Sequence, residues 1–194
     1  MQCALCKVKK CAKGQNCPGL SQEVIGSLYS AEDRRLLSAA ADVESQHYMK
    51  VSRIEESVMF AKEMGCSSIG LAFCIGLANE AGYIAQYFQK FFTVHSVCCK
   101  ICGSDKEQLE LVKRQSDQME VMCNPAIQAK VLNNTGTELN FSIGLCIAHE
   151  MIFNRYSNAP VASLVAKDHV LAHNPLGAVY SANWRKMKLG PQLQ

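Results

Sequence analysis

The chain has 194 residues, of which 48% are hydrophobic and 19% are charged, and its formal net charge is +3. This length fits one ordinary domain with a small appendage, and the apolar fraction excludes a disordered chain. The weak net charge gives no support for nucleic-acid binding. The unusual feature is the cysteine content of 11 residues, an odd number that cannot pair completely within one chain. The sequence therefore raises the question of what these thiols do.

The first residues of the sequence indicate the cellular compartment in which the protein is expected. Residues 1–20 are rich in cysteine and lysine and contain no apolar stretch of the length that a secretory signal needs. The longest apolar run, residues 69–78, is too short to span a membrane. We therefore expect a cytoplasmic protein without a membrane segment. Because thiols stay reduced in that compartment, clustered cysteines favour metal binding or redox chemistry over structural disulfides.

The first third of the chain divides into two parts. Residues 1–20 form a short cysteine-rich segment that lacks the apolar residues for a core of its own. Residues 21–65 are expected to be helical, because apolar residues recur at three- and four-residue spacing over residues 33–49 and again over residues 53–64. Gly65 fits the position that follows a helix end.

From residue 66 onward, short apolar runs alternate with helical patterns. We expect strands at residues 68–74, 93–99, 139–146 and 160–166, and helices at residues 76–91, 126–133 and 149–156. The polar residues 103–120 predict no regular element. Such alternation is typical of βαβ units. The sequence therefore predicts an α/β, Rossmann-like three-layer domain at residues 21–181, with a helical lead-in at 21–65, a βαβ core at 66–181 and a mostly parallel sheet of about four strands. A polar, loosely held tail is expected at residues 182–194.

Several cysteines fall where the predicted strands end. Carboxyl ends of parallel strands and the N-termini of the following helices share one edge of the sheet, where such folds place their sites. We therefore expect Cys99, Cys123 and Cys146 to converge and to bind a cofactor, with Cys98 and Cys102 as further ligands. For Cys66 and Cys74, simple packing is an equal alternative, because free cysteine behaves as a small hydrophobe.

Other polar side chains are predicted to reach the same edge. Asp168 and His173 follow the fourth strand, while Glu80 and His149 lie early in helices beside the edge. These four residues are candidate acid–base neighbours of the thiols. Each also has a structural interpretation, since an acid in the first turn of a helix is favourable to the helix dipole and a lone histidine is often a satisfied structural group.

The second set of cysteines lies at the N-terminus. Cys3, Cys6, Cys11 and Cys17 have the pattern C-x2-C-x4-C-x5-C. Four thiolates suffice for a tetrahedral zinc ion or a [4Fe–4S] cluster, although the spacing matches neither the usual paired zinc pattern nor the bacterial ferredoxin run. The lysines between these cysteines would balance negative charge. The competing interpretation, a basic tail that contacts nucleic acid, lacks interleaved aromatic residues for base stacking.

Several blocks of the sequence resemble the DUF1847 family of uncharacterised, cysteine-rich metal-binding proteins. They are the segment from Cys3 to Leu20, IGLAFCIGLANEA at 69–81, CCK at 98–100, CNPAIQAKVLN at 123–133, GLCIAHE at 144–150 and KDHVLAHNPLGAVY at 167–180. The resemblance implies metal binding through cysteines and supplies no reaction. Two places depart from the family pattern: His169 stands where arginine is expected, and Ala148 and Glu150 stand where glycine and aspartate are expected.

Three functions follow from these observations as alternatives. The first is an iron–sulfur or zinc protein with a four-cysteine N-terminal site and a core cluster that takes a small-molecule substrate. The second is a non-catalytic, metal-stabilised module for binding or for electron transfer to a redox partner. The third is a metal-free thiol enzyme in which Cys99 or Cys146 is the nucleophile and His149 the base. None of them involves nucleic acid or a membrane.

Overall fold

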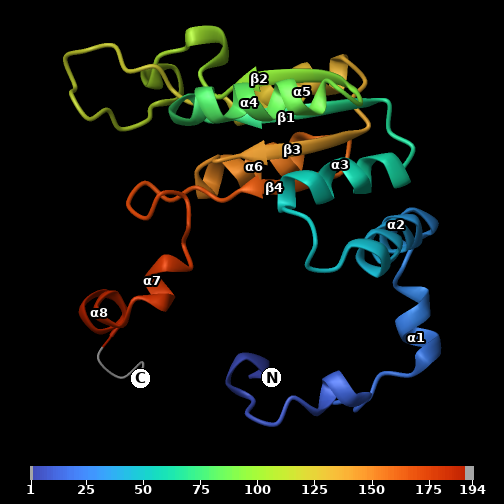
Figure 1. Ribbon diagram of the computed structural model, residues 1–194. Helices are drawn as coiled ribbons and strands as arrows, with labels where there is room; N and C mark the ends of the chain where they lie inside the picture. Colours follow the sequence, from blue (N-terminus) through green and yellow to red (C-terminus); the bar gives the residue numbers. More distant parts are fainter. Residues whose placement is uncertain (1, 191–194) are drawn as a thin grey trace.

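The computed structural model describes residues 2–190 and centres on a four-stranded sheet (Figure 1). The strands are β1 (Ser68–Phe73), β2 (Thr93–Cys98), β3 (Leu139–Ile143) and β4 (Val161–Val165). All neighbouring strands pair in parallel, in the order β2-β1-β3-β4. The predicted Rossmann-like α/β fold is confirmed.

Helices cover both faces of the sheet. On one face, α3 (Arg53–Glu63) and α4 (Ala78–Phe88) pack on β1 and β3 through a core that includes Phe88 and Phe141. On the other face, α5 (Pro125–Asn134) and α6 (Ile147–Tyr156) pack through a core that includes Leu132 and Phe153. Both faces of β1 are therefore buried, which explains why this strand is a nearly continuous apolar run.

Gly70 leaves room for the side chains of β3 and α5 that pack against β1. A Cβ atom on Gly70 would lie 2.1 Å from Oδ1 of Asn140 and 2.8 Å from Cδ1 of Leu132. Glycine at this position lets the backbone of β1 approach the side chains of β3 and α5 closely. The two halves of the sheet thus pack tightly at the centre of the molecule.

Two further helices precede the sheet. They are α1 (Gln22–Ser27) and α2 (Ala31–His47), and α2 packs on α3 through the buried side chains of Ala39 and Val43. Ser30 at the start of α2 and Ser52 at the start of α3 each form a reciprocal cap with the acid three residues later. Such caps satisfy backbone N–H groups that have no partner in the first turn. The helical lead-in predicted from the sequence therefore has clear local causes.

The third strand differs from its predicted bounds. It ends at Ile143 rather than at residue 146, because Gly144 has φ +61° and turns the chain out of the sheet. Cys146 is therefore the residue before α6, and α6 begins at Ile147, two residues earlier than expected. The change keeps Cys146 at the predicted edge but places it on a helix N-terminus.

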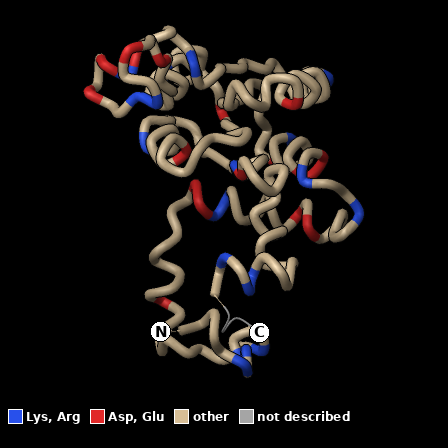
Figure 2. Tube along the Cα trace, turned by 90° about the vertical axis from the view of Figure 1, so that its left-hand side faces the viewer, with Lys and Arg blue, Asp and Glu red and all other residues tan. Residues whose placement is uncertain are grey.

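The C-terminal part of the chain is more regular than expected. Residues 182–190, predicted as a loose tail, form α8 (Ala182–Trp184) and a helical turn at Arg185–Leu189, which follow α7 (Gly177–Tyr180). None of these elements contains a buried residue. Residues 191–194 of the predicted tail lie outside the described residues. Figures 1 and 2 show that both terminal segments project beyond the β4 side of the sheet.

No helix among residues 2–190 combines the length and the apolar character that a bilayer crossing requires.

Candidate thiolate site at the carboxyl edge of the sheet

The strand order places a site between β1 and β3. The chain leaves β1 through α4 on one face, whereas it leaves β3 through α6 on the other face. In open parallel sheets, ligands bind at the carboxyl edge where the direction of winding reverses in this way. The residues that follow β1 and β3 therefore line the position at which this fold builds its sites.

Backbone hydrogen bonds align the ends of the strands at this edge. The N–H of Cys99 donates to the carbonyl of Phe73 at 2.8 Å, and the N–H of Cys74 donates to the carbonyl of Ile143 at 3.0 Å. Cys99, after β2, thus lies beside Cys74, after β1. The segment that leads into α5 joins the same edge, because the N–H of Asn124 donates to the carbonyl of Cys99 at 2.8 Å. This last contact brings Cys123 to the thiols of the two strand ends.

Cys99 and Cys123 form the closest pair of thiols in this group. Their side chains are hydrogen-bonded, and the Sγ of Cys99 also accepts the backbone N–H of Ile75 at 3.3 Å. Hydrogen bonds from Cys99 and from His149, together with the charges of Lys100 and His149, lower the pKa of Cys123 to about 4. The same hydrogen bond to Cys123, with burial, raises the pKa of Cys99. These contacts therefore favour the thiolate form of Cys123 and the thiol form of Cys99.

Cys74 and Cys146 complete the group of four thiols. The Nζ of Lys167 donates to the Sγ of Cys74 at 3.3 Å, and the Nε2 of His169 lies 4.0 Å from the Sγ of Cys146. Burial raises the pKa of Cys146, and charges at Cys74 and Cys123 raise it further. Negative charge on Cys74 or Cys123 thus makes Cys146 less acidic. We call this group of Cys74, Cys99, Cys123 and Cys146 the edge thiols.

Two of the predicted ligands lie differently. The Sγ of Cys98 accepts the backbone N–H of Lys100 at 3.5 Å. Cys102 is exposed in the turn after β2 and has a left-handed backbone with φ +70°. Neither contributes to the shifts in acidity that connect the four edge thiols. Cys74, for which packing was an equal alternative, belongs to the group instead.

The candidate acid–base residues divide into two kinds. His149 contacts the edge thiols through its hydrogen bond to Cys123. Asp168 instead accepts the backbone N–H groups of Val170 and Leu171 at 2.9 and 2.8 Å, and its own N–H donates to the Nδ1 of His173 at 3.2 Å. These two residues therefore shape the loop after β4. Glu80 is exposed in the first turn of α4.

Two residues that the sequence analysis did not assign to the site belong to it. Lys167 reaches Cys74 from the end of β4; a lysine directly after an apolar strand at this edge is the only sequence signal for it. Gln128 is completely buried, and its Nε2 donates to the carbonyls of Val97 at 2.8 Å and Phe73 at 3.3 Å. Gln128 thus holds the last residues of β1 and β2 together directly beneath the thiols.

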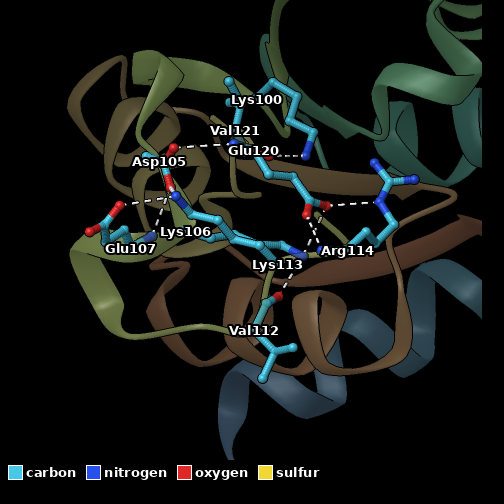
Figure 3. A network of polar contacts seen from close by, with 9 residues as sticks. All are labelled: Lys100, Asp105, Lys106, Glu107, Val112, Lys113, Arg114, Glu120 and Val121. Carbon is cyan, nitrogen blue, oxygen red and sulfur yellow. Dashed lines mark hydrogen bonds and ion pairs between the residues drawn. The ribbon is translucent and has the colours of Figure 1, made fainter. Parts of the chain in front are cut away.

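The polar loop at residues 103–121 is fastened beside the edge thiols. Figure 3 shows its network of ion pairs, in which the Oε1 of Glu120 lies 3.0 Å from both the Nζ of Lys106 and the Nε of Arg114. The backbone N–H of Arg114 and the ammonium of Lys106 are the main groups that lower the pKa of Glu120 to about 2. Lys100 connects this loop to the site, because its Nζ donates to the carbonyl of Val121 at 2.5 Å.

The N-terminal cysteines form a separate group. Cys3, Cys6, Cys11 and Cys17 are all exposed, and Lys9 has a left-handed backbone with φ +50°. This turn directs the backbone N–H groups of Lys9 and Val8 at the thiol of Cys6, and these hydrogen bonds lower its pKa. Backbone N–H groups that point at a thiolate are typical of the surroundings of a metal-bound cysteine.

Both groups have the donor chemistry of a soft-metal site, since thiolates select zinc and iron–sulfur clusters. Within residues 2–190, however, no three His, Cys, Asp or Glu side chains are arranged closely enough to hold a metal ion. A metal ion would therefore need these side chains to rotate toward one another.

Comparison with known proteins identifies the family. Residues 11–164 match the family described as “Protein of unknown function (DUF1847)”. The chain belongs to this family. It is also 42% identical over 190 residues to the Uncharacterized protein MJ0455 of Methanocaldococcus jannaschii, and the match covers 97% of this chain and 98% of that protein. No solved structure matches the chain. The DUF1847 match includes all four edge thiols, along with Cys11 and Cys17.

Proposed function

We propose that this DUF1847 protein binds a soft metal ion or an iron–sulfur cluster through the edge thiols. The observation that carries the proposal is the convergence of Cys74, Cys99, Cys123 and Cys146, which come from three separate connections of the fold, β1–α4, β2–α5 and β3–α6. Metal ligands bind in their deprotonated form, and the contacts of Cys123 favour its thiolate. Lys100 and Lys167 would offset the negative charge that additional thiolates bring.

The N-terminal cysteines support a second metal site under the same proposal. They lie within a segment that buries no side chain, so packing gives no reason for four thiols there. The backbone donors at Cys6 favour its thiolate form without a partner from the α/β core. Under this proposal, the N-terminal site would hold its metal independently of the edge thiols.

The residues around the edge thiols suit a small-molecule reaction or an electron transfer. A cluster held by three cysteines supplies an open iron position, and one held by four supplies an electron carrier. His149 is hydrogen-bonded to Cys123, and Lys100 links the end of the ion-paired loop at residues 103–121 to the segment beside the thiols. The carboxyl edge itself stays accessible, as Cys123 and Cys146 are only half-buried.

Metal analysis of matched variants tests the proposal. The protein is expressed and purified without oxygen, and its iron, sulfide and zinc contents and absorption spectrum are measured. We expect Cys123→Ser and Cys146→Ser each to lose the core metal. Cys66→Ser is the control, because Cys66 lies before β1 at the opposite end of that strand. Cys6→Ser should remove only the N-terminal metal.

The results distinguish an iron–sulfur cluster from zinc, and they also show whether the edge thiols bind metal at all. Iron and sulfide with a visible chromophore identify a cluster, whereas stoichiometric zinc without a chromophore identifies zinc. If neither Cys123→Ser nor Cys146→Ser changes the metal content, the edge thiols are not a metal site.

A second candidate function is a metal-free thiol enzyme, which the hydrogen bond between His149 and Cys123 favours. A thiolate next to a histidine is the usual arrangement of a cysteine nucleophile. The geometry supports Cys123 for this role rather than Cys99 or Cys146, the two residues expected from the sequence. A reaction that persists after complete removal of metal, and that Cys123→Ser abolishes, would establish this function instead.

A further inference from the structure

The chain exposes more surface than a compact protein of its mass. Its accessible surface is 13263 Å² for 21.3 kDa, whereas a folded monomer of this mass exposes about 9,100 Å². The segments at residues 2–30 and 170–190 project beyond the β4 side of the sheet (Figures 1 and 2) and contain no buried residue. The excess over the expected surface is about 4,000 Å², and these two segments contribute to it.

The second of these segments, residues 170–190, is both apolar and basic, and we call it the C-terminal arm. Its exposed large hydrophobic side chains are Val170, Leu176, Val179, Tyr180, Met187 and Leu189. At the end of the arm, Met187 and Leu189 alternate with Lys186 and Lys188. An exposed apolar surface of this kind on a protein marks an interaction site.

A groove of complementary character lies between α2 and α3. Its apolar lining consists of Ala40, Val43, Phe60, Phe141 and Ala162, with Arg53, Glu56 and Ser57 as its polar lining, and this part has a volume of about 220 Å³. Glu44 and Glu56 line the neighbouring part of the same groove, and Glu56 pairs with Arg53 at 3.7 Å. An apolar floor next to carboxylates suits a segment that alternates apolar and lysine side chains. Figure 1 shows that the C-terminal arm and α2 of one chain lie toward opposite ends of the sheet.

We propose that the partner on this groove is a second copy of the chain, in a two-fold symmetric dimer in which each C-terminal arm lies in the α2–α3 groove of the other copy. A two-fold axis uses both surfaces twice and leaves neither of them exposed. A standard interface buries about 800 Å² per partner, well below the excess surface. Lys186 and Lys188 would meet Glu44 and Glu56 at the rim of the groove.

The mass of the protein in solution tests this dimer. Size-exclusion chromatography with light scattering is run under reducing conditions, so that the 11 thiols do not cross-link chains. We expect twice the chain mass of 21.3 kDa. Two variants should give the monomer: Met187→Asp with Leu189→Asp in the arm, and Ala40→Glu in the groove. Each should raise the dimer dissociation constant by at least about 100-fold.

Val112→Asp is the matched control. Val112 is exposed in the loop at residues 103–121, which lies on the β2 side of the sheet, whereas the C-terminal arm projects beyond the β4 side (Figure 1), so this variant should stay dimeric. Circular dichroism of all variants confirms that the α/β core remains folded. A monomeric wild type with a radius of gyration near 16 Å would show that the arm folds onto its own core and would overturn the proposal. A dimer that persists in both the arm and the groove variants would overturn it as well, because the two chains would then meet through another surface.

Discussion

The edge thiols share one place in the fold but differ in acidity, and Cys123 is the extreme case. Its thiolate accepts hydrogen bonds from Cys99 and His149, whereas burial raises the pKa of Cys146. A thiolate reacts with alkylating agents and a thiol does not. The four sulfurs should therefore differ sharply in reactivity even though they lie together.

We predict that Cys123 in the metal-free protein reacts with iodoacetamide down to about pH 5, and that its rate falls as the pH drops through about 4. The reason is that the lowered pKa keeps the thiolate present above pH 4. An ordinary cysteine titrates near pH 8.5. Mass spectrometry of peptides from protein alkylated at a series of pH values gives the rate for each cysteine.

His149→Ala should move the alkylation profile of Cys123 to higher pH, since the variant removes a hydrogen bond and a positive charge. Cys66 is the internal control, because burial raises its pKa and it should react only at alkaline pH. If Cys123 and Cys66 show the same pH profile, the interpretation of Cys123 as a thiolate is wrong.

At this scale, the sequence predicts the position of the thiols better than their chemistry. Cys99, Cys123 and Cys146 could be assigned to one edge because strand ends in a parallel fold lie together. Which of them is ionised depends on side-chain contacts with His149 and Lys100 that spacing does not encode. Cys74 joins the group through Lys167, a residue 93 positions away along the chain.

Among the elements, the turn between β3 and α6 depends on Gly144. Its φ of +61° is a conformation that other residues rarely adopt, and a Cβ atom there would lie 2.2 Å from the Cδ1 of Leu77. Leu77 is a buried residue of the turn that follows Cys74. The absence of a side chain at Gly144 therefore lets Leu77 pack closely against the turn after β3.

We predict that Gly144→Ala lowers the free energy of unfolding by about 1–3 kcal/mol, because Leu77 must move and the backbone is strained. Chemical denaturation monitored by circular dichroism measures this loss. Gly82→Ala is the control: Gly82 lies in α4, has no neighbour within 4 Å of the added Cβ and should gain about 0.5–1 kcal/mol. Equal effects of the two substitutions would contradict the role assigned to Gly144.

The loop at residues 103–121 is held by ion pairs rather than by a core of its own. Replacing Glu120 by glutamine removes the charge that Lys106 and Arg114 share. We predict that Glu120→Gln is cleaved faster by trypsin within this loop at neutral pH. Because the pKa of the Glu120 carboxyl is lowered to about 2, its ion pairs with Lys106 and Arg114 should persist as the pH falls to about 4 and be lost only as the pH approaches 2.

Glu110→Gln is the matched control for this experiment. Glu110 is exposed in the same loop, and its side chain forms no ion pair or hydrogen bond among residues 2–190. Its cleavage rate should equal that of the wild type. If Glu120→Gln is cleaved no faster than Glu110→Gln, the ion pairs do not fasten the loop.

The elements themselves were largely predictable, because helix periodicity and β-branched apolar runs are local signals. The end of β3 was not, because the apolar pattern continues through Leu145 while the turn at Gly144 ends the strand. Leu145 is still buried, but it packs against the α5–α6 face from outside the sheet. Burial alone therefore did not distinguish a strand from the loop that follows it.

At the scale of the whole molecule, the sequence predicts a parallel sheet but not the order of its strands. The order β2-β1-β3-β4 depends on contacts between segments far apart in the chain, such as the pairing of β1 with β3. This order nevertheless decides where the site lies, because the winding reverses between those two strands. The convergence of the thiols is thus a property of the topology, which the local pattern indicates only indirectly.

In the whole molecule, the N-terminal cysteines lie in a segment that contributes no side chain to the core. No residue between 2 and 38 is buried, and the first buried side chain of the lead-in is Ala39. We predict that deleting residues 1–20 leaves the unfolding midpoint of the core nearly unchanged, since the deletion removes no buried apolar contact. Thermal unfolding followed by circular dichroism measures the midpoint.

Metal content gives this deletion a second readout. The shortened protein should lose the metal assigned to Cys3, Cys6, Cys11 and Cys17 while it retains the metal assigned to the edge thiols. Deleting residues 1–43 is the contrasting variant, because it also removes Ala39 and Val43, through which α2 packs on α3, and it should destabilise the core. A large fall in the unfolding midpoint, or the loss of all metal, after the shorter deletion would mean that the N-terminal cysteines and the edge thiols form one site. The reason is that residues 2–20 bury no side chain. They could therefore stabilise the core only by sharing a metal with the edge thiols.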